Sequence, residues 1–185
     1  LRRAVECGDD IEARYNMAWA SSMAGIVIDI SSVVLLHAVG HPICAHHDAA
    51  HGETLAALSR PFIERAWRLA PDKFARVSRI LGADVSGLDV EQAAQCCGDA
   101  LDGFLESIGL RVTLASLGAR VEMVREYARN AFKTMQGCIQ GHPAPVTEDD
   151  IAELYYEAFK SGERDQSLPT GARPSVGPHV DALGV

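Results

Sequence analysis

Apolar residues recur at intervals of three and four along most of this chain, which is the spacing of one face of an α-helix. The clearest run can be capped by Ser86 or Asp89 and ends at Gly109. Its apolar positions are Val90, Ala93, Ala94, Cys97, Leu101, Phe104, Leu105 and Ile108. Alternating patterns typical of strands are nearly absent, so the sequence predicts an all-α domain of about seven to nine helices.

Proline and the capping residues set the other predicted boundaries. Asp9 or Asp10 can cap a first helix, and an apolar helix is expected over residues 27–41, because Pro42 forbids further ordinary helix. Residues 43–50 are then expected to form a loop, and His51 to open the next helix. The remaining helices are expected at 73–81, 121–132 and 151–160.

Length and composition predict one folded domain followed by a tail. The 185 residues suffice for a single hydrophobic core, which we place in residues 1–161. Residues 162–185 are rich in Gly, Pro and Ser and carry little apolar pattern. They are expected to form a flexible tail.

Charge and cysteine usage narrow the function classes. The net charge is −8, and no basic run is longer than Arg2-Arg3, which argues against nucleic-acid binding. The apolar run 18–36 contains several serines and Asp29, so a buried core helix is expected in place of a membrane span. The five cysteines are an odd number and include adjacent Cys96 and Cys97, which predicts reduced thiols in a cytoplasmic protein.

Three histidines in the stretch HAVGHPICAHHDAAHG carry most of the functional information. His37 and His41 are four residues apart, so on a helix they share one face, and His51 follows after a turn. Spacing alone favours His37 and His41 as a two-residue clip for a metal such as Fe or Zn, with His51 as a third ligand. Further donors in the stretch are Cys44, His46, His47 and Asp48, of which Cys44 is read first as a packing residue.

Several motifs, in order, carry a family resemblance over residues 1–161. The helix DDIEARYNMAWASSMAG precedes the HxxxHP and terminal HG of the histidine stretch. The segment IGLRVTLASLG and the element HPAPVTEDDI follow at the expected places. Together they resemble the C-terminal helical domain of the group III iron-containing alcohol dehydrogenases, in the dehydroquinate synthase-like superfamily.

The resemblance implies roles for individual residues. His37 and His51 match the two metal-ligating histidines of this domain, and His41 matches the histidine beside the reacting carbonyl and the nicotinamide. Asp48 is expected to support His51 or the substrate from outside the ligand set, and Cys44 stands where the family usually has Gly. The implied cofactors are Fe²⁺, with Zn²⁺ as the alternative, and NAD or NADP. The implied substrate is a small alcohol or aldehyde, and the full-length protein is expected to be a homodimer.

Other elements of the family have no match in this chain. The family's other two ligands, spaced DxxxH, and its GGGS-type phosphate loop lie in and near an N-terminal nucleotide-binding domain. That domain is absent from these residues, so the chain alone is expected to be inactive. Two alternatives stay open: a relative like maleylacetate reductase or glycerol dehydrogenase, and a stand-alone helical binding or regulatory domain.

Overall fold

The structure, a computed structural model, describes residues 1–166, and within them it contains ten α-helices, two 3-10 turns and no strand. The all-α prediction is therefore confirmed. The helices are α1 (Arg2–Glu6), α2 (Ile11–Ser31), α3 (Leu35–His47), α4 (His51–Ala66), α5 (Pro71–Leu81), α6 (Val90–Gln95), α7 (Cys97–Ser107), α8 (Val124–Thr134), α9 (Gln136–Gln140) and α10 (Glu148–Gln166). The 3-10 turns are Trp67–Leu69 and Val121–Met123.

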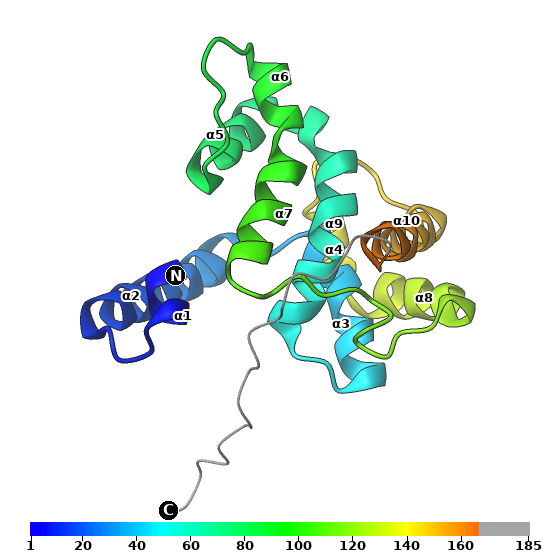
Figure 1. Cartoon of the computed structure of the whole chain (residues 1–185). Coiled ribbons are helices and arrows are strands. Elements are labelled where there is room, and N and C mark those ends of the chain that lie inside the picture. The colour runs from blue at the N-terminus through cyan, green and yellow to red at the C-terminus, as the bar shows by residue number, and fades with distance from the viewer. Residues whose placement is uncertain (167–185) are drawn as a thin grey trace, which may run out of the picture.

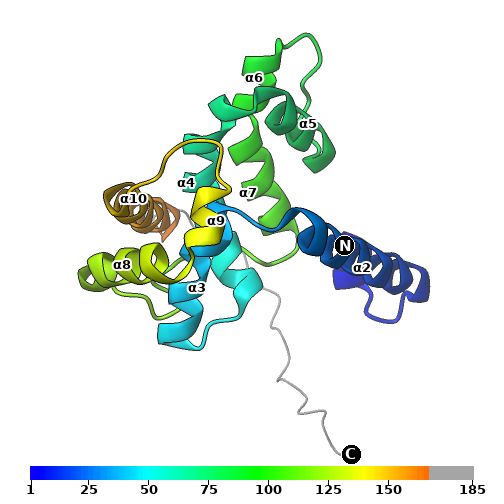
Figure 2. The ribbon, with the colours of Figure 1, turned by 180° about the vertical axis from the view of Figure 1, so that it is seen from behind.

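The main core is formed by α3, α4, α8, α9 and α10, which lie together on one side of the molecule (Figure 1). Amphipathic spacing explains why these helices pack. In α8, for example, Val124, Tyr127, Ala128 and Ala131 fall on one face and are all buried. The view from behind shows α9 lying over α3 (Figure 2). The core thereby holds α3, which carries His37 and His41, from several sides.

A smaller apolar cluster joins the 3-10 turn Trp67–Leu69, α5 and α6 at the other end of α4 (Figure 1). Trp67, Ala75, Ala93 and Ala94 form its buried centre. The Ser78 hydroxyl donates to the Ala93 carbonyl oxygen across 2.7 Å, which links α5 to α6 inside the cluster. This unit is remote from the histidines and stabilises only the far end of α4.

Helices α1 and α2 form an arm that projects away from both clusters (Figure 1). Only Ala13 is buried in the 21 residues of α2, so the predicted buried core helix is wrong for the part of the run that lies in this arm. Asp10 caps α2 by accepting from the Ala13 backbone N–H, as its position before the apolar run predicts. Within residues 1–166 no single helix is long and apolar enough to cross a membrane; α2 and α3 meet that test only as a pair bent by 109°.

Two expected boundaries near Pro42 are wrong. The predicted helix 27–41 is interrupted between α2 and α3, at a point where Ser32 has a positive φ of 61°. Helix α3 then continues through Pro42 to His47, which leaves only residues 48–50 in the predicted loop 43–50. A proline inside a helix removes one hydrogen bond and destabilises it by about 3 kcal/mol. Here Pro42 is buried in the core, and the Tyr155 hydroxyl donates to the Val39 carbonyl across 2.6 Å in the affected turn.

Other boundaries differ in smaller ways. The long helix expected after Asp89 divides at Cys96 into α6 and α7, although Asp89 and Gln92 do form its capping box. Helix α10 runs to Gln166, past the residue at which the tail was expected to begin. The rest of that predicted tail, 167–185, lies outside the described residues.

Candidate functional site

A short turn between α3 and α4 brings the three histidines together. His37 and His41 project from α3, and His51 is the first residue of α4. Asp48 ends α3 in the left-handed conformation, with φ 51°, which reverses the chain within three residues. The helices pack closely at Gly40, where a Cβ would lie 3.1 Å from Thr54 Oγ1 and 3.2 Å from Leu55 Cδ2. A side chain at position 40 would require the side chains of Thr54 and Leu55 to shift by a few tenths of an ångström.

His51 lies between the other two rings. Its Nε2 atom is 3.0 Å from Nδ1 of His37, and its ring centroid is 5.1 Å from those of both His37 and His41. His37 is half-buried, whereas His41 and His51 are exposed. The hydrogen-bonded pair is thus His37 with His51, the pair that the family resemblance assigns to the metal. Helical spacing alone favoured His37 with His41, which share a helix face but have no ring contact of this kind.

The second ring nitrogen of His51, Nδ1, contacts Cys44. The Sγ atom lies 3.5 Å from His51 Nδ1 and 3.5 Å from the Oγ1 of buried Thr54. Asp48, for which support of His51 was expected, is exposed and makes no side-chain hydrogen bond within residues 1–166. The role of Asp48 therefore stays a prediction. The sequence pattern does not indicate the contact of Thr54 with Cys44, although a threonine in a helix commonly donates to the carbonyl three or four residues earlier, as Thr54 does to His51.

The local environment keeps the paired rings neutral. Burial lowers the pKa of His37, and the neighbouring His51 and His41 lower it further. Burial also lowers the pKa of His51, with a smaller effect of His41. A pKa below the usual 6.5 leaves both rings uncharged at pH 7. Neutral imidazole is the form that binds a metal, so both residues are ready to act as ligands.

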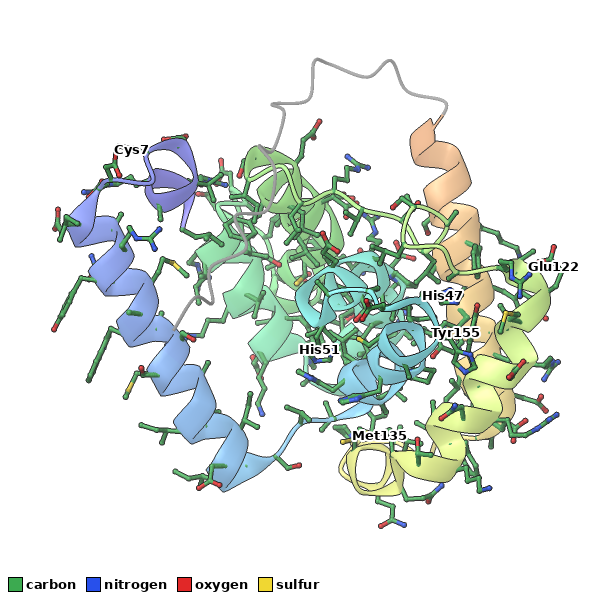
Figure 3. The ribbon with its side chains drawn as sticks, turned by 90° about the horizontal axis from the view of Figure 1, so that it is seen from below. Cys7, His47, His51, Glu122, Met135 and Tyr155 are labelled. Atoms are coloured by element: carbon green, nitrogen blue, oxygen red, sulfur yellow. The ribbon has the colours of Figure 1, made fainter. Side chains whose placement is uncertain are left out.

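The histidines at the end of α3 have a different place. His47 Nε2 and the Tyr127 hydroxyl are 2.6 Å apart, and His46 Nε2 is 3.4 Å from the Asn130 amide nitrogen. Figure 3 labels His47 and His51 at separate places in the molecule. His46 and His47 therefore connect α3 to α8 and do not join the cluster of His37, His41 and His51. Within the described residues no group of three or more His, Cys, Asp or Glu side chains could hold a metal.

Histidine burial predicts how stability depends on pH. Burial lowers the pKa of His47 and His142 as it does for His37 and His51, and Nδ1 of His142 is buried without a hydrogen-bond partner. Below about pH 6.5 the unfolded chain takes up protons that the folded chain resists. We therefore expect the free energy of unfolding to be steady from about pH 8 to 7 and to decrease as the pH falls through about 6. Urea denaturation across this range measures it.

Single substitutions show which histidines cause this pH dependence of stability. His142→Gln should flatten it, because the substitution removes one of the buried titrating groups. His46→Gln, the same substitution at an exposed histidine, is the comparison variant. A chain that becomes more stable as the pH decreases towards 6 would contradict the expectation.

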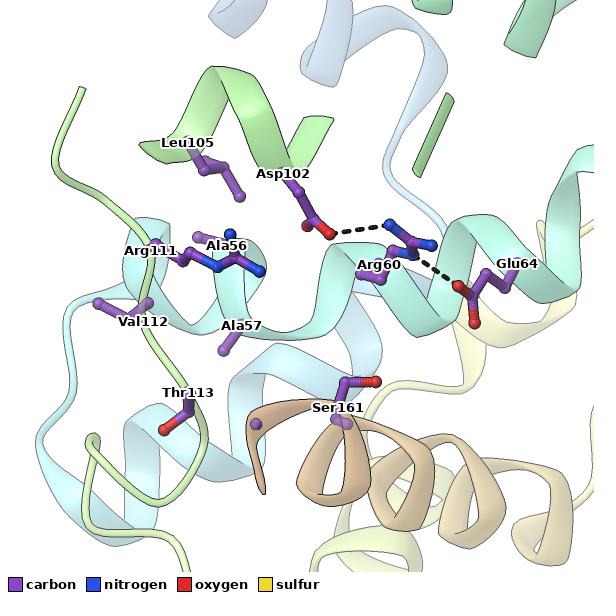
Figure 4. Close-up of a pocket in the computed structure, with 12 residues that line it drawn as sticks. Ala56, Ala57, Arg60, Glu64, Asp102, Leu105, Arg111, Val112, Thr113 and Ser161 are labelled. Carbon is purple, nitrogen blue, oxygen red and sulfur yellow. Dashed lines mark hydrogen bonds and ion pairs between the residues drawn. The ribbon is translucent and has the colours of Figure 1, made fainter. Parts of the chain in front are cut away.

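A cavity of about 240 Å³ lies between α4, α7 and α10, and none of the clustered histidines lines it (Figure 4). Arg60 crosses this cavity wall and donates to Asp99 and Asp102 across 2.6 Å and 2.8 Å, and it also pairs with Glu64. Gly98 makes room for the guanidinium, since a Cβ there would lie 2.8 Å from Arg60 Nε. Because the Arg60 guanidinium is already paired with carboxylates, it is not available to bind a ligand in the cavity. We therefore take the histidine cluster as the candidate site.

Comparison with known proteins identifies the family of this chain. A family model described as the C-terminal part of the Fe-containing alcohol dehydrogenase family matches residues 1–159. The chain belongs to the iron-containing alcohol dehydrogenase family. The match includes every residue of the histidine cluster, and it confirms the family that the motifs indicated.

Relatives and solved structures of this family match the same part of the chain. The sequence is 30% identical to a choline dehydrogenase of Bacillus subtilis and 31% identical to an NAD-dependent methanol dehydrogenase of Bacillus methanolicus, in each case over 86% of this chain. It covers only 39% and 41% of the length of those two proteins. The structure is similar to a 1,3-propanediol oxidoreductase, with a TM-score of 0.79, 28% identity, and coverage of 85% of this chain and 41% of the other.

Proposed function

We propose that this chain forms the metal-binding half of an NAD(P)-linked alcohol dehydrogenase that interconverts small alcohols and aldehydes. The observation that carries the proposal is the 3.0 Å separation of His37 Nδ1 and His51 Nε2 in a domain of this family. Two nitrogens that each lie about 2.1 Å from one cation, at a right angle, are about 3.0 Å apart. The spacing therefore fits two ligands of a single divalent metal, Fe²⁺ or alternatively Zn²⁺.

The residues of the cluster divide the work. A metal bound here would act as a Lewis acid on the alcohol or aldehyde oxygen. His37 and His51 hold it through neutral ring nitrogens. His41 is exposed next to His51, where it can move the alcohol proton or orient the nicotinamide of NAD or NADP. Asp48, at the turn into α4, supports His51 or the substrate.

The same observations support the proposal that the 185-residue chain alone does not catalyse the reaction. Two protein nitrogens leave a divalent metal short of the three or four protein ligands of a typical tight site. The chain also covers about two fifths of its named relatives, one of which is called NAD-dependent. We therefore propose that further metal ligands and most of the NAD(P) contacts come from sequence beyond these 185 residues.

The test compares the protein expressed from its complete reading frame with the 185-residue chain. Both are loaded with Fe(II) or Zn(II) under reducing conditions and assayed for NADH or NADPH formation with methanol, 1,3-propanediol and choline. We expect metal-dependent turnover that a chelator abolishes in the complete protein, and no turnover in the chain alone. Turnover that survives complete removal of the metal would favour a metal-independent relative, and metal-loaded protein without any turnover would favour a binding module.

A further inference from the structure

The single hydroxyl proton of Thr54 is used in a backbone hydrogen bond. Thr54 is fully buried, and its Oγ1 donates to the His51 carbonyl oxygen across 2.8 Å. A hydroxyl carries one donor and two acceptor lone pairs. Towards Cys44 Sγ, which lies 3.5 Å away, Thr54 can therefore only accept, so the Cys44 thiol is the donor of a hydrogen bond between them. The other acceptor within reach of the thiol is His51 Nδ1, also at 3.5 Å. Thr54 is fully buried and has no other side-chain donor among residues 1–166, whereas His51 is exposed to water, so we assign the thiol proton to Thr54.

That assignment of the thiol proton determines the tautomer of His51. Once the thiol proton is directed to Thr54, Cys44 presents sulfur lone pairs to His51 Nδ1 at 3.5 Å, and Nδ1 must carry the ring proton. In a neutral imidazole the other nitrogen, Nε2, then carries the lone pair. In the metal-free chain that assignment agrees with the second contact of the ring, because His51 Nε2 can accept from an Nδ1–H of His37 across 3.0 Å. A metal on His37 Nδ1 would require His37 to carry its ring proton on Nε2 instead.

We propose that Cys44 and Thr54 are positioning residues that hold His51 in its Nδ1–H tautomer, with the lone pair of Nε2 directed at the metal. The hydrogen bond from Nδ1 selects the nitrogen that faces the metal and fixes the orientation of the ring. The assignment of a metal to this lone pair rests on the proposed function. The tautomer itself rests on the contacts among Thr54, Cys44 and His51 and on donation of the Cys44 thiol proton to Thr54.

The tautomer is measured directly in the metal-free chain. Long-range proton–nitrogen NMR on ¹⁵N-histidine protein distinguishes a protonated ring nitrogen from an unprotonated one, and His51→Gln identifies the His51 signals. We expect the Nδ1–H form to dominate in the original chain. Cys44→Ala should give a mixture of tautomers, and Cys44→Ser should restore the original form, because a hydroxyl can also donate to Thr54 and accept from Nδ1.

Thr54→Val provides an independent test should Cys44→Ala fail to fold. Without the acceptor at position 54, the Cys44 thiol is free to donate to Nδ1, so the tautomer should shift towards Nε2–H. Thr54→Ser, which keeps the hydroxyl, is its matched control. An unchanged His51 tautomer in both Cys44→Ala and Thr54→Val would overturn the proposal.

Zinc titration separates this inference from the proposed function. Loss of a hydrogen bond that orients a ligand lowers metal affinity by about 10- to 100-fold. We expect that loss in Cys44→Ala and near-normal affinity in Cys44→Ser. If Zn(II) affinity is instead the same in His37→Ala, His51→Ala and the original chain, the proposed metal site fails, while the tautomer result stands on its own. Unchanged zinc affinity in Cys44→Ala, together with a mixed tautomer, would overturn the link to the metal.

Discussion

His51→Ala is expected to remove the metal from the complete protein and to lower the rate of alcohol oxidation by about 10³-fold or more. A Lewis-acid metal stabilises the developing charge by several kcal/mol, and each 1.36 kcal/mol corresponds to about a tenfold change in rate. His51 supplies one of the two ring nitrogens that face each other across 3.0 Å, and within residues 1–166 no third ligand completes the group. Metal analysis after desalting and the turnover number with NAD measure the two effects.

His46→Ala is the matched control for this substitution. His46 lies on the same helical hairpin and is exposed like His51, but its ring contacts Asn130 and Tyr127 in place of the cluster. It should retain both metal and turnover. The fold of His51→Ala should be intact, since the side chain is exposed and the core contacts of α4 come from other residues. A folded His51→Ala protein that keeps stoichiometric metal and normal turnover would refute the assignment of His51 as a ligand.

Helices with a clear two-sided pattern could be predicted from the sequence, and those without one could not. The buried face of α8 follows directly from the spacing of Val124, Tyr127 and Ala131. The run that contains α2 is apolar on most sides, so periodicity could not show where it breaks or that the first part projects as an arm. Helix α3 continues through Pro42, which is buried in the core, and the Tyr155 hydroxyl, 116 positions away in the sequence, donates to the nearby Val39 carbonyl; local spacing indicates neither contact.

The candidate site shows the same division. Helical spacing places His37 and His41 on one face of α3. It cannot show which of the two forms a hydrogen bond with His51. The position of His51 depends on the turn at residues 48–50 and on the close packing at Gly40. The family resemblance supplied the pairing of His37 with His51. Neither spacing nor resemblance indicated the contact of His51 with Cys44, because that contact depends on side-chain conformations across two helices.

His41→Ala is expected to leave the metal bound and to lower the turnover number by about 10²- to 10⁴-fold, the usual contribution of a positioned proton donor or acceptor. His41 is exposed, and its ring lies beside His51 without the hydrogen bond that joins His51 to His37. Its loss should therefore spare the ligand pair. Metal content and the turnover number at saturating NAD and alcohol, determined on the same preparation as for His51→Ala, distinguish the two roles.

The dependence of the His41→Ala rate on pH then separates a proton carrier from a residue that only orients the nicotinamide. If His41 moves the alcohol proton, the substitution should remove one limb of the pH–rate profile, and added imidazole should recover part of the rate. If it orients the nicotinamide, the Michaelis constant for NAD should increase and the profile should keep its shape. Loss of the metal in His41→Ala would contradict both and would restore the clip of His37 with His41 that helical spacing alone favours.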